Sequence, residues 1–172
     1  MTIPTGAWFD REWSFGLPIH AFSAVVERLR GTPVLAAHLL TGVSEEALGA
    51  RVGGQWSAKD HLGHLDDLSD LDELRLEEFL NGASVLSAAD PTNAATVRAD
   101  HANRPARDVV TGLRVRREEL VRRLEGLGED DVGRTSLHPR LQQPMRLIDW
   151  AFFVAEHDDH HLAKARECVA RR

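Results

Sequence analysis

Three histidines stand close together near the end of the sequence, in the segment EHDDHH at positions 156–161. On a helix, residues three or four positions apart lie on one face with Cβ atoms about 5–6 Å apart, so His157 can share a metal ion with His160 or with His161. The apolar period favours His161, because it and His157 point to the same edge of the apolar stripe as Trp150 and Val154. His160 points away from that stripe, and we expect it at the rim or surface.

Two histidines do not complete a metal site, since stable zinc sites use three or four protein ligands. A second helical segment carries His61 and His64 on or beside its own apolar stripe, and either of them can face the pair. Metal sites in helical bundles are built in this way from facing helices. A single histidine on an apolar face is more often a hydrogen-bonded core residue. The histidines without a spacing signal are expected at the surface or in caps: His20, His38, His101 and His138.

Apolar periodicity predicts four helices that position these side chains. Ser57 and Asp60 have the spacing of a capping box at the start of the second helix, with Asp in place of the usual Glu. Thr32 and Pro33 look like an N-cap followed by a first-turn proline, so a break or kink is expected in the first helix. The four predicted ranges are about Pro18–Leu40, Ser57–Leu80, Ala106–Leu127 and Met145–Val169.

The segments between these helices are long and irregular. Residues 81–104 are small and polar, residues 128–144 contain several glycines and prolines, and neither segment shows useful strand-like alternation. We therefore predict an all-α four-helix bundle with long connecting loops, forming one domain over residues 1–172. Residues 1–16 are expected to form an extension packed on the bundle through its aromatic residues Trp8, Phe9 and Trp13.

Composition excludes several classes of function. The formal net charge is −6 and no long Lys/Arg run is present, which argues against nucleic-acid binding. No apolar stretch approaches the roughly 20 residues of a membrane-spanning helix, and the N-terminus lacks the apolar segment of a signal peptide. Cys168 is the only cysteine, so no disulfide within the chain is possible and a cytoplasmic location is expected. We expect Cys168 to be a small buried residue.

Two segments resemble the DinB-like (damage-inducible, YfiT-like) superfamily. GGQWSAKDHLGHL at 53–65 is similar to its W-S-x-K-[DE]-x-x-x-H-L signature, and LHPRLQQPMRLIDWAFFVAEHDDHHLAKARE at 137–167 is similar to its terminal helix. The resemblance implies an up-down-down-up bundle, frequent homodimers and one divalent ion, zinc or nickel. It also implies that His64, eight residues after Trp56, is a ligand together with His157 and His161.

Three neutral imidazoles would leave the ion an open coordination position, which is typical of catalytic sites. Such an ion lowers the pKa of bound water to roughly 7 and deprotonates a bound thiol. The resemblance favours a metal-dependent thiol S-transferase that joins a small thiol to a small electrophile. A metal-dependent hydrolase and a non-catalytic metal-binding stress protein are the alternatives.

Other polar residues are weaker candidates for the site. Asp60 and Asp158 can orient the metal-binding histidines, although Asp60 equally suits a helix cap and Asp158 a buried pair with His61 or an arginine. Arg116 interrupts the stripe of the third helix, where it can bind a substrate carboxylate, extend to solvent or pair with an acid. The segment 81–104 and the N-terminal aromatic residues are the expected material for pocket walls.

Overall fold

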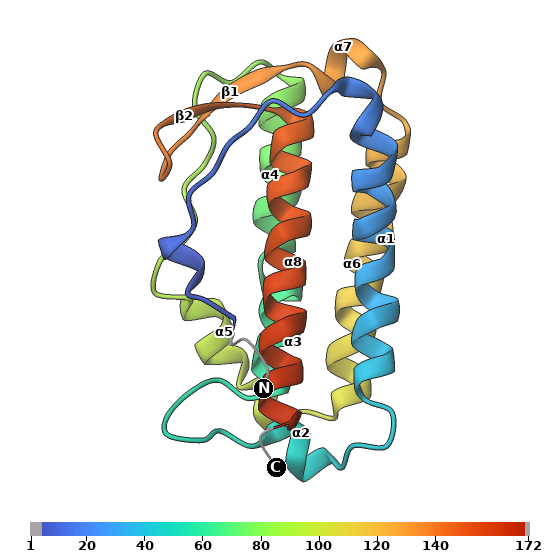
Figure 1. The fold of residues 1–172 in the computed structure, drawn as a ribbon, viewed down its shortest axis with the longest axis vertical. Helices are drawn as coiled ribbons and strands as arrows, with labels where there is room; N and C mark the ends of the chain where they lie inside the picture. Colours follow the sequence, from blue (N-terminus) through green and yellow to red (C-terminus); the bar gives the residue numbers. More distant parts are fainter. Residues whose placement is uncertain (1–4, 171–172) are drawn as a thin grey trace.

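Four helical columns form the bundle in the computed structural model, which describes residues 5–170 (Figure 1). α1 and α3 each pack against both α6 and α8, and therefore lie at opposite corners. Figure 1 shows the chain running down α1, up α3 and α4, up α6 and down α8. The predicted all-α bundle with up-down-down-up order is thus confirmed. The columns are α1 (Phe22–Leu39), α3 (Ala58–Asp67) continued by α4 (Ser69–Leu80), α6 (Ala106–Glu125) and α8 (Leu147–Ala170).

A short antiparallel hairpin, which the sequence did not indicate, covers one end of the bundle. Its strands β1 (Thr135–His138) and β2 (Gln143–Arg146) pair with His138 opposite Gln143. Each strand has only four residues, too few for a recognisable alternation. The remaining elements are short: η1 (Trp8–Asp10), η2 (Ile19–Ala21), α2 (Glu45–Gly49), α5 (Ala94–Ala99), η3 (His101–Asn103) and α7 (Glu129–Val132).

Two helix boundaries differ from those predicted. The expected break at Pro33 is wrong, because α1 continues through it as a single helix. Thr32 does not cap a helix but donates its hydroxyl proton to Asp158 over 2.8 Å. The second predicted helix is divided at Leu68, which keeps a right-handed helical conformation and accepts a hydrogen bond of 3.0 Å from Asp72 N–H. α3 and α4 therefore follow each other as one column.

Side-chain hydrogen bonds mark the starts of α3 and α8. The predicted capping box is present at the start of α3, where the Ser57 hydroxyl accepts from Asp60 N–H and the Asp60 carboxylate accepts from Ser57 N–H. At the start of α8, the Asp149 carboxylate accepts the N–H groups of Gly16 and Leu17 at 3.0 and 3.2 Å. This contact ties the N-terminal segment to the helix that carries two of the candidate ligands.

The core consists of two apolar clusters separated by a polar layer. The cluster around Leu76, Leu120 and Trp150 fills the end near the hairpin, and that around Leu62 and Leu113 fills the other end. Each column carries at least one buried polar residue near the boundary between the two clusters. This polar layer consists of Thr32 of α1, His64 of α3, Asp72 of α4, Arg117 of α6, and Asp158 and His161 of α8.

The N-terminal segment packs along α8. Trp8 and Trp13 pack against Phe153 of α8, with ring centroids 5.1 and 4.7 Å away. Phe9, expected to help anchor the segment, is 62% exposed. Residues 1–4 of the predicted extension lie outside the described residues. Within residues 5–170, no helix is long and apolar enough to cross a membrane.

Candidate metal centre

Three histidines from two helices converge in the polar layer. His64 lies in the last turn of α3, and His157 and His161 lie one turn apart on α8. One ring nitrogen of each lies within 4.8 Å of the other two, and the Nε2 atoms of His157 and His161 are 3.1 Å apart. The structure therefore brings together the three residues that the resemblance implied as ligands.

The spacing and charge of these rings suit a divalent ion. Two nitrogens bound at about 2.0–2.1 Å in a tetrahedral arrangement lie about 3.3 Å apart, close to the observed separation of His157 and His161. Burial lowers the pKa of His64 to about 4, and it lowers the pKa values of His157 and His161 well below the usual value. All three rings are thus neutral at pH 7 and offer the lone pairs that coordination requires.

A chain of hydrogen bonds orients His64. Its Nδ1 lies 2.9 Å from the Thr96 hydroxyl of α5, and Thr96 also bonds to Asp67. Burial disfavours the charge of Asp67, but hydrogen bonds from His101 and Thr96 prevail and lower its pKa. Because the hydroxyl donates to this carboxylate, its oxygen accepts from His64 Nδ1–H, which leaves Nε2 of His64 available to an ion.

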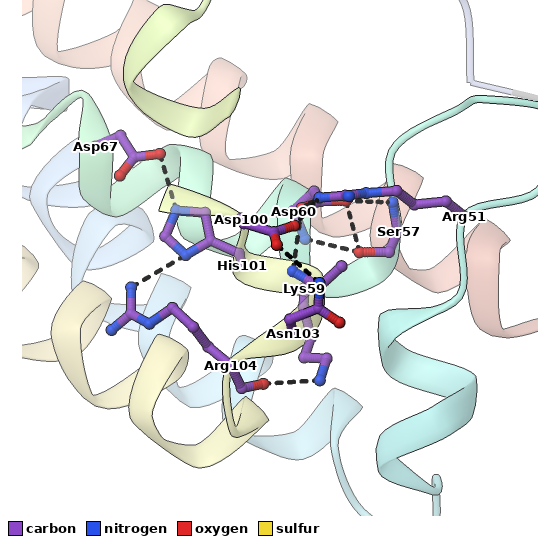
Figure 2. Close-up of polar contacts among 10 residues, drawn as sticks. Arg51, Ser57, Lys59, Asp60, Asp67, Asp100, His101, Asn103 and Arg104 are labelled. Carbon is purple, nitrogen blue, oxygen red and sulfur yellow. Dashed lines mark hydrogen bonds and ion pairs between the residues drawn. The ribbon is translucent and has the colours of Figure 1, made fainter. Parts of the chain in front are cut away.

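His101 supports this chain from inside the fold, so its expected place at the surface or in a cap is wrong. It is 1% exposed, and its Nε2 donates to Asp67 over 2.9 Å, as Figure 2 shows. Its Nδ1 accepts from Arg104. The ring lies against Gly63 of α3, where a Cβ atom would overlap it. A glycine inside a helix was the sequence signal for this close approach.

The other two histidines of the candidate set take supporting positions. Nδ1 of His61 lies 3.0 Å from Nδ1 of His161, which places Nε2 of His161 towards His157. His61 therefore contacts the cluster from outside through His161, whereas His64 is one of its three members. His160 is half-buried, with its ring centroid 5.5 Å from that of Trp8, and its nitrogens are not part of the three-histidine group.

Neither aspartate proposed as a partner of the histidines takes that role. The Asp60 carboxylate binds Ser57, Arg51 and the N–H of Ala102, as Figure 2 shows in part. Asp158 points towards α1 and α6, where it accepts from Thr32 and pairs with Arg117, each over 2.8 Å. The alternatives given for these residues, a helix cap and a buried pair with an arginine, describe what the structure shows.

The arginine that faces the interior of the bundle is Arg117, one position after the residue proposed from the sequence. Arg116 lies outside the pocket and pairs with the exposed Asp70. Arg117 is 2% exposed and binds Asp72 as well as Asp158. Adjacent residues on a helix point about 100° apart, so Arg117 faces the interior while Arg116 does not. Cys168 is half-buried, and its thiol donates to the Trp56 carbonyl.

A pocket of about 630 Å³ lies beside the three histidines. Both segments expected to form walls contribute to it, through Trp8 and Phe9 and through residues 88–91. Trp8 meets the His157 ring edge-on, with centroids 4.8 Å apart. The hairpin turn contributes His138 and Arg140, which the sequence did not indicate. His138 is 2% exposed, so the surface or cap position expected for it is also wrong.

Comparisons with known proteins agree with the fold and with the family resemblance. A family model described as the DinB superfamily matches residues 28–165. The solved structure of YfiT from Bacillus subtilis, described as a probable metal-dependent hydrolase with an unusual four-helix bundle topology, superposes with a TM-score of 0.80. The two chains are 16% identical, and the match covers 94% of this chain and 93% of YfiT. A search among curated proteins found no significant match.

Proposed function

We propose that this chain, which belongs to the DinB superfamily, is a metal-dependent enzyme that hydrolyses a small molecule in the pocket. One observation carries the proposal: the neutral nitrogens of His64, His157 and His161 converge beside a pocket of about 630 Å³. Pockets of about 300–1,000 Å³ are typical of small-molecule sites. Three protein ligands are also the usual number at a catalytic zinc.

The residues of the chain would hold and orient the ion, for which we propose zinc or nickel. A divalent ion held there would supply Lewis-acid activation, which makes water or a thiol a nucleophile near neutral pH. Thr96 keeps the proton of His64 on Nδ1, and His61 does the same for His161. Trp8 and Trp56 pack against the histidine rings and exclude bulk water from the pocket wall.

The nucleophile distinguishes two candidate reactions. Hydrolysis is supported by the likeness to YfiT, which is described as a probable metal-dependent hydrolase. Thiol transfer to a small electrophile is the second candidate, and the pocket volume favours it, because about 630 Å³ can hold two reactants together. Both reactions would use the same three histidines.

Assays on metal-loaded protein separate the two reactions. Zinc- or nickel-loaded protein is incubated with small esters and amides alone, and separately with bacillithiol or glutathione plus activated halides and epoxides. We expect cleavage without a thiol in the wild type and in His160→Ala, and none in His157→Ala. Turnover only with a thiol would replace hydrolysis by thiol transfer. No turnover in either assay, with the metal bound, would favour a non-catalytic metal-binding protein.

A homodimer is a further proposal, taken from the resemblance to a family that often forms dimers. Two-fold dimers are also the commonest oligomers. Light scattering at micromolar concentration would contradict the proposal if it gave the monomer mass of 19.1 kDa.

A further inference from the structure

A group of donors that does not belong to the three-histidine cluster lines the pocket near the hairpin. It consists of Arg75 of α4, His138 at the end of β1 and Arg140 in the hairpin turn. Both arginines lie near enough to His138 to disfavour its protonation. His138 and Arg140 both face the Phe153 ring, at 5.2 Å between ring centroids and 5.9 Å from the Arg140 Cζ. Phe153 lies one turn before His157 on α8.

His138 presents a buried donor with no partner. Its Nδ1 accepts the N–H of Leu141 over 3.2 Å, so in the neutral ring the proton is on Nε2. Burial lowers the pKa of His138 to about 4, which keeps the ring neutral at pH 7. The side chain is 2% exposed, and Nε2 has no hydrogen-bond partner among the described residues. Unpaired buried donors are rare and call for a ligand or water.

Neither arginine of this group has an acidic partner within ion-pair distance in residues 5–170. Arg140 lies over the rings of Phe9 and Phe153, and its guanidinium takes part in no ion pair there. Arg75 is 5% exposed and donates Nε and Nη2 to the Ser87 carbonyl. Asp72 and Glu78 act on Arg75 only from beyond ion-pair distance, and a buried arginine is rarely left without an ion pair, so the charge of this group favours an anionic ligand.

The acidic residues of the pocket are already engaged. Asp72 pairs with Arg117 over 3.3 Å, and Asp90 accepts from Thr92 and from the N–H of Ala94. The nearby Asp72 offsets part of the positive charge of Arg75. A singly charged, planar carboxylate therefore suits this group better than a phosphate with two charges, and arginine binds carboxylates through two parallel hydrogen bonds.

We propose that Arg140, Arg75 and His138 bind a carboxylate of the substrate, whose apolar body lies on Phe153 and Trp8. The substrate is then a small organic acid, and its carboxylate is held about one helical turn, about 5.4 Å along α8, from the histidine cluster. The assignment of this acid as substrate rests on the proposed hydrolysis. The binding of the acid does not rest on the proposed hydrolysis, because Arg75, His138 and Arg140 are not among the candidate metal ligands.

Paired ligands test the carboxylate subsite. The full chain, freed of metal so that a carboxylate cannot coordinate an ion, is titrated with 4-phenylbutanoate and with the neutral 4-phenylbutanamide, and tryptophan fluorescence reports binding. We expect the acid to bind the wild type at least about tenfold more tightly than the amide, as a charged hydrogen-bonded contact predicts. Arg140→Gln should abolish that preference. Arg116→Gln, which removes an exposed arginine outside the pocket, should retain it.

Two controls make the result decisive. Arg140→Lys keeps the charge and should retain part of the preference, and thermal melts show whether each variant is folded. His138→Leu should reduce the preference without reversing it. Equal or undetectable binding of the acid in the wild type, or an unchanged preference in Arg140→Gln, would overturn the proposal. A clear preference in a protein that hydrolyses nothing when metal-loaded would support the subsite and contradict the proposed hydrolysis instead.

Discussion

Two buried polar clusters lie side by side in the polar layer, and α8 contributes to both. His157 and His161 face α3 and the pocket, whereas Asp158, between them in sequence, faces α1 and α6. Both clusters are desolvated, and desolvation of unpaired polar groups is costly. They differ in how far their polar atoms are satisfied within the described chain.

The cluster around Asp158 is nearly closed. One carboxylate oxygen accepts from Arg117 over 2.8 Å and the other from the Thr32 hydroxyl over 2.8 Å. Arg117 also reaches Asp72, and its Nε is the only described side-chain atom of this cluster that is buried without a partner. Such a cluster holds α1, α4, α6 and α8 in one register, and two of its members, Asp72 and Arg117, also line the pocket.

The three-histidine cluster is open. Each of His64 and His161 has one nitrogen engaged by a neighbour, Thr96 or His61, while one nitrogen from each of the three rings lies within 4.8 Å of the other two. Three neutral rings hold one N–H each, and those of His64 and His161 are assigned to the engaged nitrogens, so the three converging nitrogens share at most one proton and leave lone pairs without donors. The comparison teaches that burial alone does not mark a functional site. A functional site is marked by lone pairs that converge beside a pocket.

Breaking the closed cluster should have the largest effect on stability. Asp158→Ala leaves Arg117 buried with one weaker partner, and removal of one member of a buried ion pair costs about 3–5 kcal/mol. Urea unfolding of the metal-free protein measures the loss. Asp159→Ala is the matched control, because this neighbouring acid is exposed and, among residues 5–170, forms an ion pair only with Arg28, which predicts a change of about 0–1 kcal/mol. Similar losses in both variants would contradict the comparison.

Breaking the open cluster should remove metal while changing the metal-free stability much less. At a zinc concentration 100 times the Kd, the wild type should gain about 2.7 kcal/mol of unfolding free energy. His64→Ala, His157→Ala and His161→Ala should each lose this gain, and His160→Ala should retain it. Metal analysis and melts with and without zinc give the result. Full zinc occupancy in His157→Ala would exclude it as a ligand.

The sequence predicted the parts of this molecule that depend on local periodicity. The four columns follow from apolar spacing, and the one-turn separation of His157 and His161 follows from helix geometry. The choice of His64 over His61 needed the resemblance, because both lie on or beside the same stripe. The place of Arg117 was missed because residues three and four positions after Leu113 suit a helical stripe almost equally well.

The residues that complete the site come from segments without periodicity. Thr96 lies on a helix of six residues that begins after Asn93, whose φ of 52° is left-handed. His138 and Arg140 are positioned by a hairpin whose pairing also involves residues 84–86. Such positions depend on contacts between distant parts of the chain, which local propensity does not encode.

Weakening the hydrogen bond behind His64 should have an intermediate effect. Thr96→Val keeps the shape of the side chain but removes the hydroxyl that accepts from Nδ1, so the ring loses its fixed orientation. Loss of such a supporting contact typically lowers metal affinity 10–100-fold. Competition with a metal-binding dye measures the affinity, and Thr96→Ser, which keeps the hydroxyl, should restore most of it. Wild-type affinity in Thr96→Val would mean that Thr96 only fills space.

Mild acid should have the smallest effect, and burial is the reason. Protons compete appreciably with an ion for histidine only near or below the pKa of the metal-free ring, which is about 6.5 for an exposed histidine. Burial lowers the pKa of His64 to about 4, and lowers those of His157 and His161 well below the usual value. These rings therefore stay neutral as the pH falls from 7 to about 5, and zinc affinity should change by less than about threefold over that range.

An exposed His-x-x-x-His peptide is the matched control, because its rings protonate through pH 6.5 and it should lose affinity steeply. The dye competition, repeated at each pH, compares the two. A loss in the protein as steep as in the peptide would mean that the open cluster is solvated, and the contrast with the closed cluster would then rest on hydrogen bonding alone.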